Sequence, residues 1–323
     1  MTALTTENRN SSVDCEFAGS CFGEFQMIVA RIEGGLGNQL FQYAFGTQLA
    51  YRNNTELVLD LSSYASKPAH GYMLDRFSIG FRELRSDEWK RIPGRYREGK
   101  RSLLQALVFT GKELTRVRER PFGFSEKYMS APDDSYLVGY WQSERFFRDV
   151  TTKIREQFRP TVSMSSETLR IRDRMLNSSS IAIHLRRGDY ITTQPMAARN
   201  LSLDYYRECV VSQLARRPES EVYVFSNDIP WCLANLDLPC RVHFVEHTNN
   251  ATAHEDLCLM TAAECLVIAN STFSWWGAYL SERQDKTIFT PKSWYHPGTL
   301  DDSNINCKDW NLVGDRGMHR RAA

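Results

Sequence analysis

The sequence has no apolar run of about eighteen residues, the length that a membrane-spanning helix requires. Its first 26 residues are polar and do not form the basic-then-apolar pattern of a signal peptide. These absences predict a chain that is neither secreted nor membrane-spanning. Charge of one sign is lacking too, because 40 basic residues face 39 acidic ones. The net charge of +1 therefore gives no global argument for a nucleic-acid or strongly anionic membrane partner.

Paired metal-ligand spacings are also missing. The eight cysteines form no Cys-x-x-Cys, and several lie in apolar segments, which favours reduced thiols in the core. A local disulfide between Cys232 and Cys240 is the alternative if the chain is oxidised. No Asp-x-Asp metal–diphosphate signature follows a strand, since the acidic pairs at 133–134 and 301–302 lack the spacing. The spacing of the acidic residues therefore gives no indication of a metal–diphosphate site.

Hydrophobic patterning predicts alternating strands and helices. Strands are expected at 27–32, 57–61, 136–141, 181–184, 222–225, 242–245, 266–269 and 287–289, and helices at 38–50, 143–158, 203–215, 253–263 and 274–281. This alternation is typical of parallel sheets with crossover helices. We expect an α/β fold of two Rossmann-type domains that face a cleft, at 27–160 and 161–323, after a polar, flexible extension at 1–26.

The segment after the predicted strand 181–184 carries the strongest functional signal. It holds His184, Arg186, Arg187, Gly188 and Asp189 where a buried parallel strand delivers polar groups into a crevice. Arginine offers a planar fork of donors that stays charged, which suits a phosphate whose negative charge grows as it leaves. The alternative is a solvated turn in which the aspartate pairs with an arginine.

A glycine-rich turn links the first predicted strand to the first predicted helix. Gly35, Gly37 and Asn38 would present backbone N–H groups and a helix N-terminus to an anion. Leu40 stands where a Gly-x-Gly-x-x-Gly motif would need its third glycine, which disfavours dinucleotide binding. A purely structural turn is an equal alternative.

Three further polar groups follow predicted strands or start helices. Asn227 and Asp228 could bond a ribose or base, or cap the next helix. Asp256 could accept from the N1–H and amine of a guanine, or cap its own helix.

The last of these groups lies before the predicted helix 274–281. Short donors and a stacking face precede two tryptophans that are either core or a sugar platform, in the order Asn270, Ser271, Thr272, Phe273, Trp275 and Trp276.

Together the motifs at 34–42, 184–190, 225–228 and 270–278, with the segment 140–144, resemble the α-1,2-fucosyltransferase family. They occur in that family's order over residues 27–290. The resemblance implies a GT-B-like pair of Rossmann-type domains and GDP-β-L-fucose as the donor. It further implies transfer to the 2-hydroxyl of a terminal galactose with inversion, and no metal.

The resemblance also implies roles for single residues. The catalytic residues would be Arg186, Arg187 and Asp189. Arg186 would contact the departing β-phosphate, and Arg187 and Asp189 would hold its loop. His184 and Asp256 would lie near the nucleoside. The full donor-binding set is Gly35, Gly37, Asn38, His184, Arg186, Asn227, Asp228, Asp256, Asn270, Ser271, Thr272 and Phe273.

Acceptor recognition is expected from the first domain, with Asn38 and Gln39 near the junction of donor and acceptor. The sequence leaves the general base open among Glu33, Asp189, His184 and a late proton transfer to water. It does not separate the galactosides that could serve as acceptor.

Two other classes remain open. One is a fucosyltransferase of α-1,6 or protein O-linked type, which lacks the Ser-Trp-Trp-Gly segment found here. The other is a catalytically silent sugar-binding module, against which the intact Arg186, Arg187 and Asp189 argue.

Bacterial members of the resembled family modify surface polysaccharide or lipid-linked sugars. We therefore expect a cytoplasmic enzyme that acts on a galactose-terminated oligosaccharide or lipid-linked glycan. The basic stretch 91–101 predicts either peripheral membrane contact or a solvated face.

Overall fold

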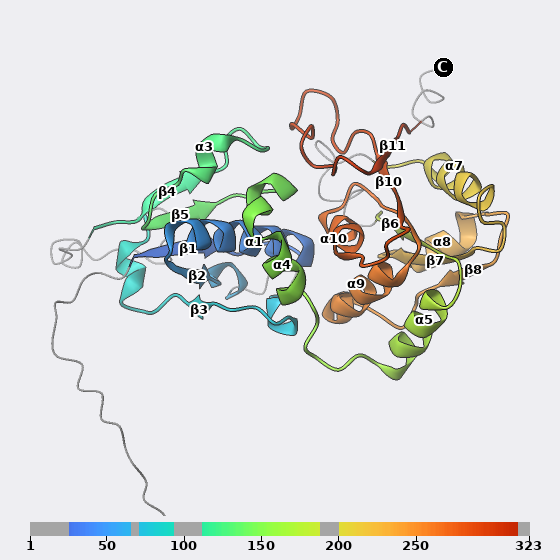
Figure 1. The fold of residues 1–323 in the computed structure, drawn as a ribbon, viewed down its shortest axis with the longest axis horizontal. Helices are drawn as coiled ribbons and strands as arrows, with labels where there is room; N and C mark the ends of the chain where they lie inside the picture. The colour runs from blue at the N-terminus through green and yellow to red at the C-terminus, as the bar shows by residue number, and fades with distance from the viewer. Residues whose placement is uncertain (1–25, 66–70, 94–111, 188–199, 316–323) are drawn as a thin grey trace, which may run out of the picture.

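The computed structural model describes residues 26–65, 71–93, 112–187 and 200–315. They form two parallel sheets that lie side by side, each flanked by helices (Figure 1). This arrangement confirms the predicted α/β class with two Rossmann-type units. Asp189 and most of the basic stretch 91–101 lie outside the described residues, so the expectations about them are not addressed.

The first sheet is built around β1, whose four N-terminal residues are buried. The strand order is β3-β2-β1-β5-β4, and every neighbouring pair is parallel. In the register Val29 lies beside Val58 on one side and Tyr136 on the other. The strands are β1 (Met27–Arg31), β2 (Glu56–Asp60), β3 (Arg82–Glu83), β4 (Thr115–Arg118) and β5 (Ser135–Val138).

Helix α1 (Leu36–Asn53) follows β1 and is buried around most of its circumference. Between 36 and 50 every residue except Asn38 is buried. A helix that is apolar on all sides belongs in the interior, and α1 packs against both β1 and the second half of the chain. It ends at Asn54, whose left-handed backbone caps the last carbonyls.

The second sheet has the order β11-β10-β9-β6-β7-β8 and is also parallel throughout. Its central strand β6 is buried along its whole length, as its apolar run predicts. The strands are β6 (Ser180–Leu185), β7 (Glu221–Ser226), β8 (Val242–Phe244), β9 (Cys265–Val267), β10 (Thr287–Pro291) and β11 (Asn311–Val313). The helices around them are α5 (Ser166–Leu176), α7 (Leu203–Leu214), α8 (Ile229–Asn235), α9 (Ala253–Ala262) and α10 (Thr272–Leu280).

Several predictions are corrected by the structure. The strand expected at 136–141 ends at Val138, and the helix expected at 143–158 is a 3-10 helix, Glu144–Val150, followed by α4 (Thr151–Gln157). The helix is interrupted twice, at Phe147 inside the 3-10 segment and at Val150 before α4, whose φ angles of −135° and −119° are not helical. The short strands β4 and β11 were not predicted. Cys232 and Cys240 are both free, so the alternative disulfide is absent.

The two halves share one hydrophobic core. We call its central part the aromatic seam. Phe41 of α1 lies 4.6 Å from Trp275 and 4.8 Å from Trp276, measured between ring centroids. Phe147 stacks on Trp276 at 5.4 Å, and Phe158 meets the same indole edge-on at 5.1 Å. Both tryptophans are fully buried, so they belong to the core and are not a sugar platform. The seam consists of Phe41, Phe147, Phe158, Trp275, Trp276 and Tyr279.

The strand order of the two sheets indicates where a ligand would bind. In each sheet the direction of winding reverses beside the first strand, since β1 lies between β2 and β5 and β6 lies between β9 and β7. Ligands of doubly wound sheets bind at the carboxyl ends of strands at this reversal. The turns after β1, β5, β6, β7 and β9 are therefore the segments to examine for a site.

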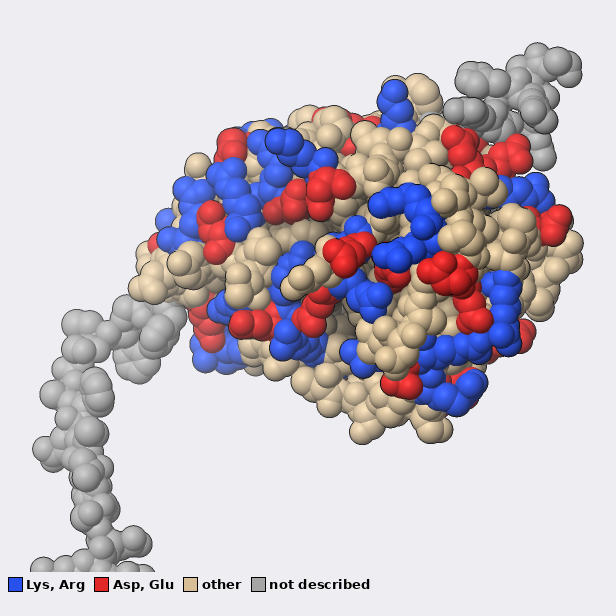
Figure 2. Space-filling view, turned by 45° about the vertical axis from the view of Figure 1, so that its right-hand side comes forward, with Lys and Arg blue, Asp and Glu red and all other residues tan. Residues whose placement is uncertain are grey.

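Basic and acidic residues, nearly equal in number, are also mixed on the surface. On the face drawn in Figure 2 basic and acidic side chains lie interspersed. Within the described ranges, no helix is both long and apolar enough to cross a membrane.

Candidate active site

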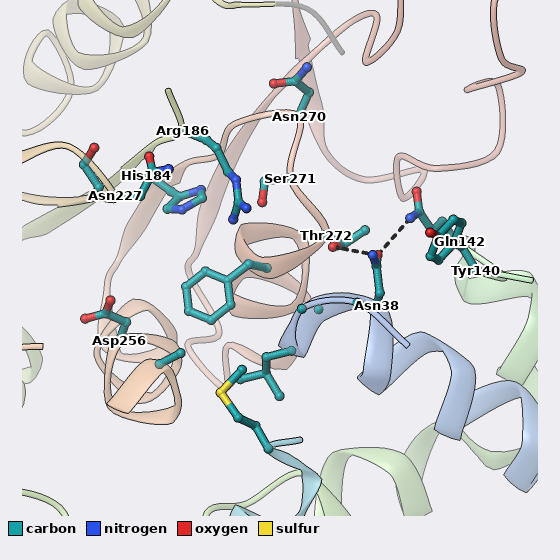
Figure 3. A pocket seen from close by; sticks show the side chains of 18 of the residues that line it. Asn38, Tyr140, Gln142, His184, Arg186, Asn227, Asp256, Asn270, Ser271 and Thr272 are labelled. Atoms are coloured by element: carbon teal, nitrogen blue, oxygen red, sulfur yellow. Dashed lines mark hydrogen bonds between the residues drawn. The ribbon is translucent and has the colours of Figure 1, made fainter. Parts of the chain in front are cut away.

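A pocket of about 720 Å³ lies where the turns of the two sheets meet. Its lining comes from the turns after β1, β5, β6, β7 and β9, from the segments that follow β2, β4, β8 and β10, and from the start of α9. Figure 3 shows Asp256 and Asn227 at one end, Tyr140 and Gln142 at the other, and Arg186 between them. The pocket is therefore elongated, and both halves of the chain are needed to form it.

Three helices that begin at this pocket, α1, α9 and α10, have no side-chain cap. Gly34 turns the chain after β1 with a φ of +82°, and Gly35 is the N-cap of α1. Ser271 is the N-cap of α10, and neither cap residue's side chain bonds the helix. Helices α5, α7 and α8 by contrast are capped by side chains. The first N–H groups of α1 and α10 are thus left for an anion in the pocket.

The two helix starts touch at Gly37. A Cβ atom added there would lie 2.5 Å from both the Thr272 carbonyl carbon and the Phe273 nitrogen. Trp276 Nε1 also donates to the Gly37 carbonyl at 3.0 Å. Only glycine allows this approach, because any side chain would force the helices apart. The predicted donor residues Gly35 and Gly37 therefore act through their backbone and their small size.

His184 and Arg186 enter the pocket from the end of β6. The Arg186 side chain lies beside Ser271, near the start of α10 (Figure 3). The His184 ring is 6% exposed and lies 5.6 Å from the Phe273 ring, tilted by 59°. Asn270, Ser271, Thr272 and Phe273 all line the same wall. A fixed positive charge and two helix N-termini thus converge on the middle of the pocket.

Arg187 and Asp228 lie beside the pocket rather than in its lining. The Arg187 backbone N–H donates to Asn227 Oδ1 at 3.0 Å, and its guanidinium lies 3.9 Å from the Trp231 ring centroid. Asp228 caps α8 by accepting from the Trp231 N–H at 3.2 Å and is 3.8 Å from Arg187 Nε. These contacts hold the loop that follows β6, and Asn227 itself does line the pocket.

Asp256 lies at the same end of the pocket as Asn227, at the start of α9. Burial raises the pKa of this carboxyl to about 7. The hydroxyl of Thr248, which donates to Asp256 Oδ1 at 2.6 Å, acts in the opposite direction, and the nearby Glu255 adds to the rise. A buried carboxyl with one hydroxyl partner retains acceptor capacity for a ligand.

A polar network crosses the junction of the two halves. Asn38 Oδ1 accepts from Gln142 Nε2 at 3.0 Å and from Thr272 Oγ1 at 3.1 Å (Figure 3). Tyr295 in turn donates its hydroxyl to Gln142 Oε1 at 3.0 Å. Asn38 therefore lies in the lining at the junction, where the sequence placed it.

Gln39 has a different position from the one expected. Its amide donates to the carbonyls of Gly34 and Gly71 and accepts from the Met73 N–H. The side chain is fully buried and absent from the pocket lining. One step along a helix rotates the side chain by about 100°, so Gln39 turns inward when Asn38 faces the pocket. Its hydrogen bonds position the glycine turn.

Comparison with known proteins identifies the family. Residues 115–314 match the model of glycosyl transferase family 11. An α-1,2-colitosyltransferase of Escherichia coli is 30% identical over 290 residues, which cover 88% of this chain and 98% of that protein. The chain belongs to glycosyl transferase family 11.

Other similar proteins are also named as glycosyltransferases. The O-antigen biosynthesis glycosyltransferase WbnK of Escherichia coli is 27% identical, with 82% of this chain and 93% of that protein covered. Galactoside 2-α-L-fucosyltransferase Sec1 of Mus musculus is 26% identical, with 79% of this chain and 64% of that protein covered. Among solved structures, NodZ α-1,6-fucosyltransferase soaked with GDP-fucose has a TM-score of 0.44 and 16% identity, over 80% of this chain and 93% of that chain.

Several residues that line the pocket were not predicted from the sequence. The segment 140–144 contributed to the resemblance, yet Tyr140 and Gln142 were given no role. Thr248, Phe122 and Tyr295 also line the pocket. They come from loops without a motif, so only the fold brings them to the site.

The candidates for the general base occupy different places. His184 lies in the pocket, on the side of Asn227. Glu33 is not in the lining and pairs with Arg31, whose Nε lies 3.1 Å from Glu33 Oε2. Across the described segments, no group of three or more His, Cys, Asp or Glu side chains could hold a metal ion.

Proposed function

We propose that this chain transfers L-fucose from GDP-β-L-fucose to the 2-hydroxyl of a terminal galactose with inversion. The observation that carries the proposal is the convergence of Arg186 with the uncapped starts of α1 and α10 in one pocket. Family membership and relatives named as α-1,2-colitosyl and galactoside 2-α-L-fucosyl transferases support the linkage and the substrates.

The proposed reaction breaks the bond between the fucose anomeric carbon and the β-phosphate oxygen. The bonding electrons leave with GDP, and the galactose 2-oxygen forms the new bond from the opposite face. Its proton passes to a base or to water. Because charge grows on the departing diphosphate, Arg186 and the helix N–H groups stabilise the transition state more than the ground state.

We place the GDP from the middle of the pocket toward Asp256. The diphosphate lies against Arg186, Ser271 and Thr272, and the guanine donates its N1–H and amine to the Asp256 carboxylate. His184, Asn227, Asn270 and Phe273 complete this donor site, while Arg187 and Asp189 hold the loop. The cation that other diphosphate sites require is replaced by arginine and amides, so transfer is expected without metal.

The proposal assigns the donor to a domain at 161–323 and the acceptor to one at 27–160. The relative in O-antigen biosynthesis supports a galactose-terminated oligosaccharide or lipid-linked glycan as the acceptor. It also supports a cytoplasmic location, and cell fractionation would test this and show whether the chain contacts the membrane.

Colitose is a second candidate for the transferred sugar, because a colitosyltransferase covers nearly the whole chain. Colitose is 3-deoxy-L-fucose, so the same linkage and leaving group apply. Competition between the two GDP-sugars, measured as a ratio of kcat/KM, decides which donor the pocket prefers.

The first test is transfer from GDP-fucose to lactose in EDTA, with the product linkage read by NMR. Wild-type protein is expected to give a 2′-fucosylated product, and Arg186→Ala to lower kcat by at least about 100-fold. Arg170→Ala is the matched control, because Arg170 is exposed and pairs with Glu167 on α5. Absence of product with lactose and other galactosides, from a folded protein that binds GDP, would refute the proposal.

A further inference from the structure

The end of the pocket remote from Asp256 is lined mainly by aromatic and aliphatic side chains. Tyr140 lies at this end (Figure 3), Tyr295 bonds the adjacent Gln142 and packs against Phe122, and Leu300 also lines the pocket; we call these four residues the aromatic end. Phe122 meets Tyr295 edge-on with ring centroids 5.6 Å apart. Tyr140 and Leu300 are 39% and 40% exposed, so their apolar surfaces are open to a ligand. The middle of the pocket, with Arg186, separates this end from Asp256 (Figure 3).

Polar groups border the same end. Asn38 Oδ1 is occupied by Gln142 and Thr272, which leaves the Nδ2 group as a donor at the junction. The Gln142 amide is fixed in turn by the Tyr295 hydroxyl. A surface with aromatic faces and a few fixed polar groups matches the chemistry of a pyranose, which has C–H groups on one face and hydroxyls around its rim.

One buried carboxylate holds both loops of this end. Glu119 Oε2 accepts from the backbone N–H groups of Tyr140 at 2.7 Å and Trp141 at 3.1 Å. Its Oε1 accepts from the Gly123 N–H at 3.3 Å, next to Phe122. Trp141 is held at a φ of +56°, a region that bulky residues rarely adopt. Backbone strain held by a buried charge is typical of a surface whose shape matters for binding.

We infer that the aromatic end is the acceptor subsite, in which a galactose ring stacks on Tyr140 and Phe122. This inference rests on the proposed function and specifies where its acceptor binds. A sugar stacked there has its hydroxyl rim directed toward Asn38 and the middle of the pocket, where the donor's anomeric carbon would lie. The subsite also replaces Gln39, whose side chain is buried, as the source of acceptor contacts.

The test compares Tyr140→Ala, which removes the stacking face, with Tyr140→Phe, which keeps it. Tyr140→Ala is expected to raise the KM for lactose about tenfold, and Tyr140→Phe to leave it within about twofold. The Kd for GDP and the hydrolysis of GDP-fucose by water should stay unchanged in both. Tyr51→Ala is the matched control, because Tyr51 is an exposed tyrosine on α1 outside the pocket.

Binding of lactose to the GDP-loaded protein, followed by saturation-transfer NMR, separates the two proposals. Transfer by wild type with an unchanged lactose KM in Tyr140→Ala would overturn the subsite and leave the proposed function standing. Lactose binding that needs Tyr140, without any transfer, would support the subsite and overturn the function. A weaker Kd for GDP in Tyr140→Ala would place the nucleotide at this end and refute the subsite. Neither binding nor transfer would refute both.

Discussion

Lowering the pH should weaken the binding of a GDP-sugar through Asp256. Burial raises the pKa of this carboxyl to about 7, whereas a guanine that donates two hydrogen bonds requires the ionised form. In the free protein a carboxyl with a raised pKa stabilises the fold below about pH 4. That contribution is lost as the pH rises toward 7, since the unfolded chain then binds fewer protons than the folded one. The ligand reverses this preference by stabilising the carboxylate.

The size of the effect follows from the pKa. At about pH 5.5 about one in thirty Asp256 carboxyls is ionised, whereas nearly all are ionised at about pH 8. The Kd for GDP-fucose should therefore be about thirtyfold higher at about pH 5.5 than at about pH 8, which is a loss of about 2 kcal/mol in binding free energy. GDP-fucose is the right probe, because its diphosphate is esterified at both ends and does not titrate in this range. His184 faces the same pocket, so a variant must show which group is responsible.

Isothermal titration calorimetry at both pH values, in two buffers of different ionisation enthalpy, measures the affinity and the protons released. Asp256→Asn should bind more weakly at about pH 8 and lose most of the pH dependence, because its amide does not titrate. A wild-type Kd that does not change with pH would refute the reasoning. A dependence that survives unchanged in Asp256→Asn would assign it to another group, with His184 as the first candidate.

Three further changes test the architecture. Gly37→Ala should lower kcat at least about tenfold, since its methyl group would meet the start of α10, whereas Gly314→Ala, with open space around it, should not. Phe41→Ala should lower the free energy of unfolding in urea by about 3–5 kcal/mol, against under about 0.5 for the exposed Leu169→Ala. Glu119→Ala leaves three backbone N–H groups without an acceptor, so we expect a loss of about 2–4 kcal/mol in the same assay. A loss of unfolding free energy no larger than that of Leu169→Ala would contradict either stability prediction.

The sequence predicted those parts of the site that depend on the periodicity of strands. Apolar runs located β1, β6, β7 and β9, and the carboxyl ends of parallel strands gather at one edge. His184, Arg186 and Ser271 were therefore expected to meet although they are far apart along the chain, and the pocket contains all three.

Predictions were less accurate where a neighbour from the other half of the chain determines the environment. Nothing in the pattern of Trp275 and Trp276 shows that Phe41 and Phe147 cover them, so their choice between core and platform stayed open. Gln39 was assigned to the acceptor although its burial follows only once α1 is enclosed on all sides.

The residues of the aromatic end are a second case of this kind. Phe122 and Tyr140 lie in turns without regular periodicity, and Glu119, which holds them, is an isolated acidic residue in the sequence. Its three backbone partners exist only in the folded chain, so no spacing rule could have identified them.

The aromatic seam constrains how this enzyme could be recombined with its relatives. A chimera that joined its first half to the second half of another member would pair Phe41, Phe147 and Phe158 with tryptophans shaped for different neighbours. The mismatch would lie beside Gly37 and the start of α10, so poor packing would displace the two helix starts that meet at the pocket. If the aromatic end is the acceptor subsite, replacing the loops around Phe122 and Tyr140 would change the acceptor preference without disturbing the seam.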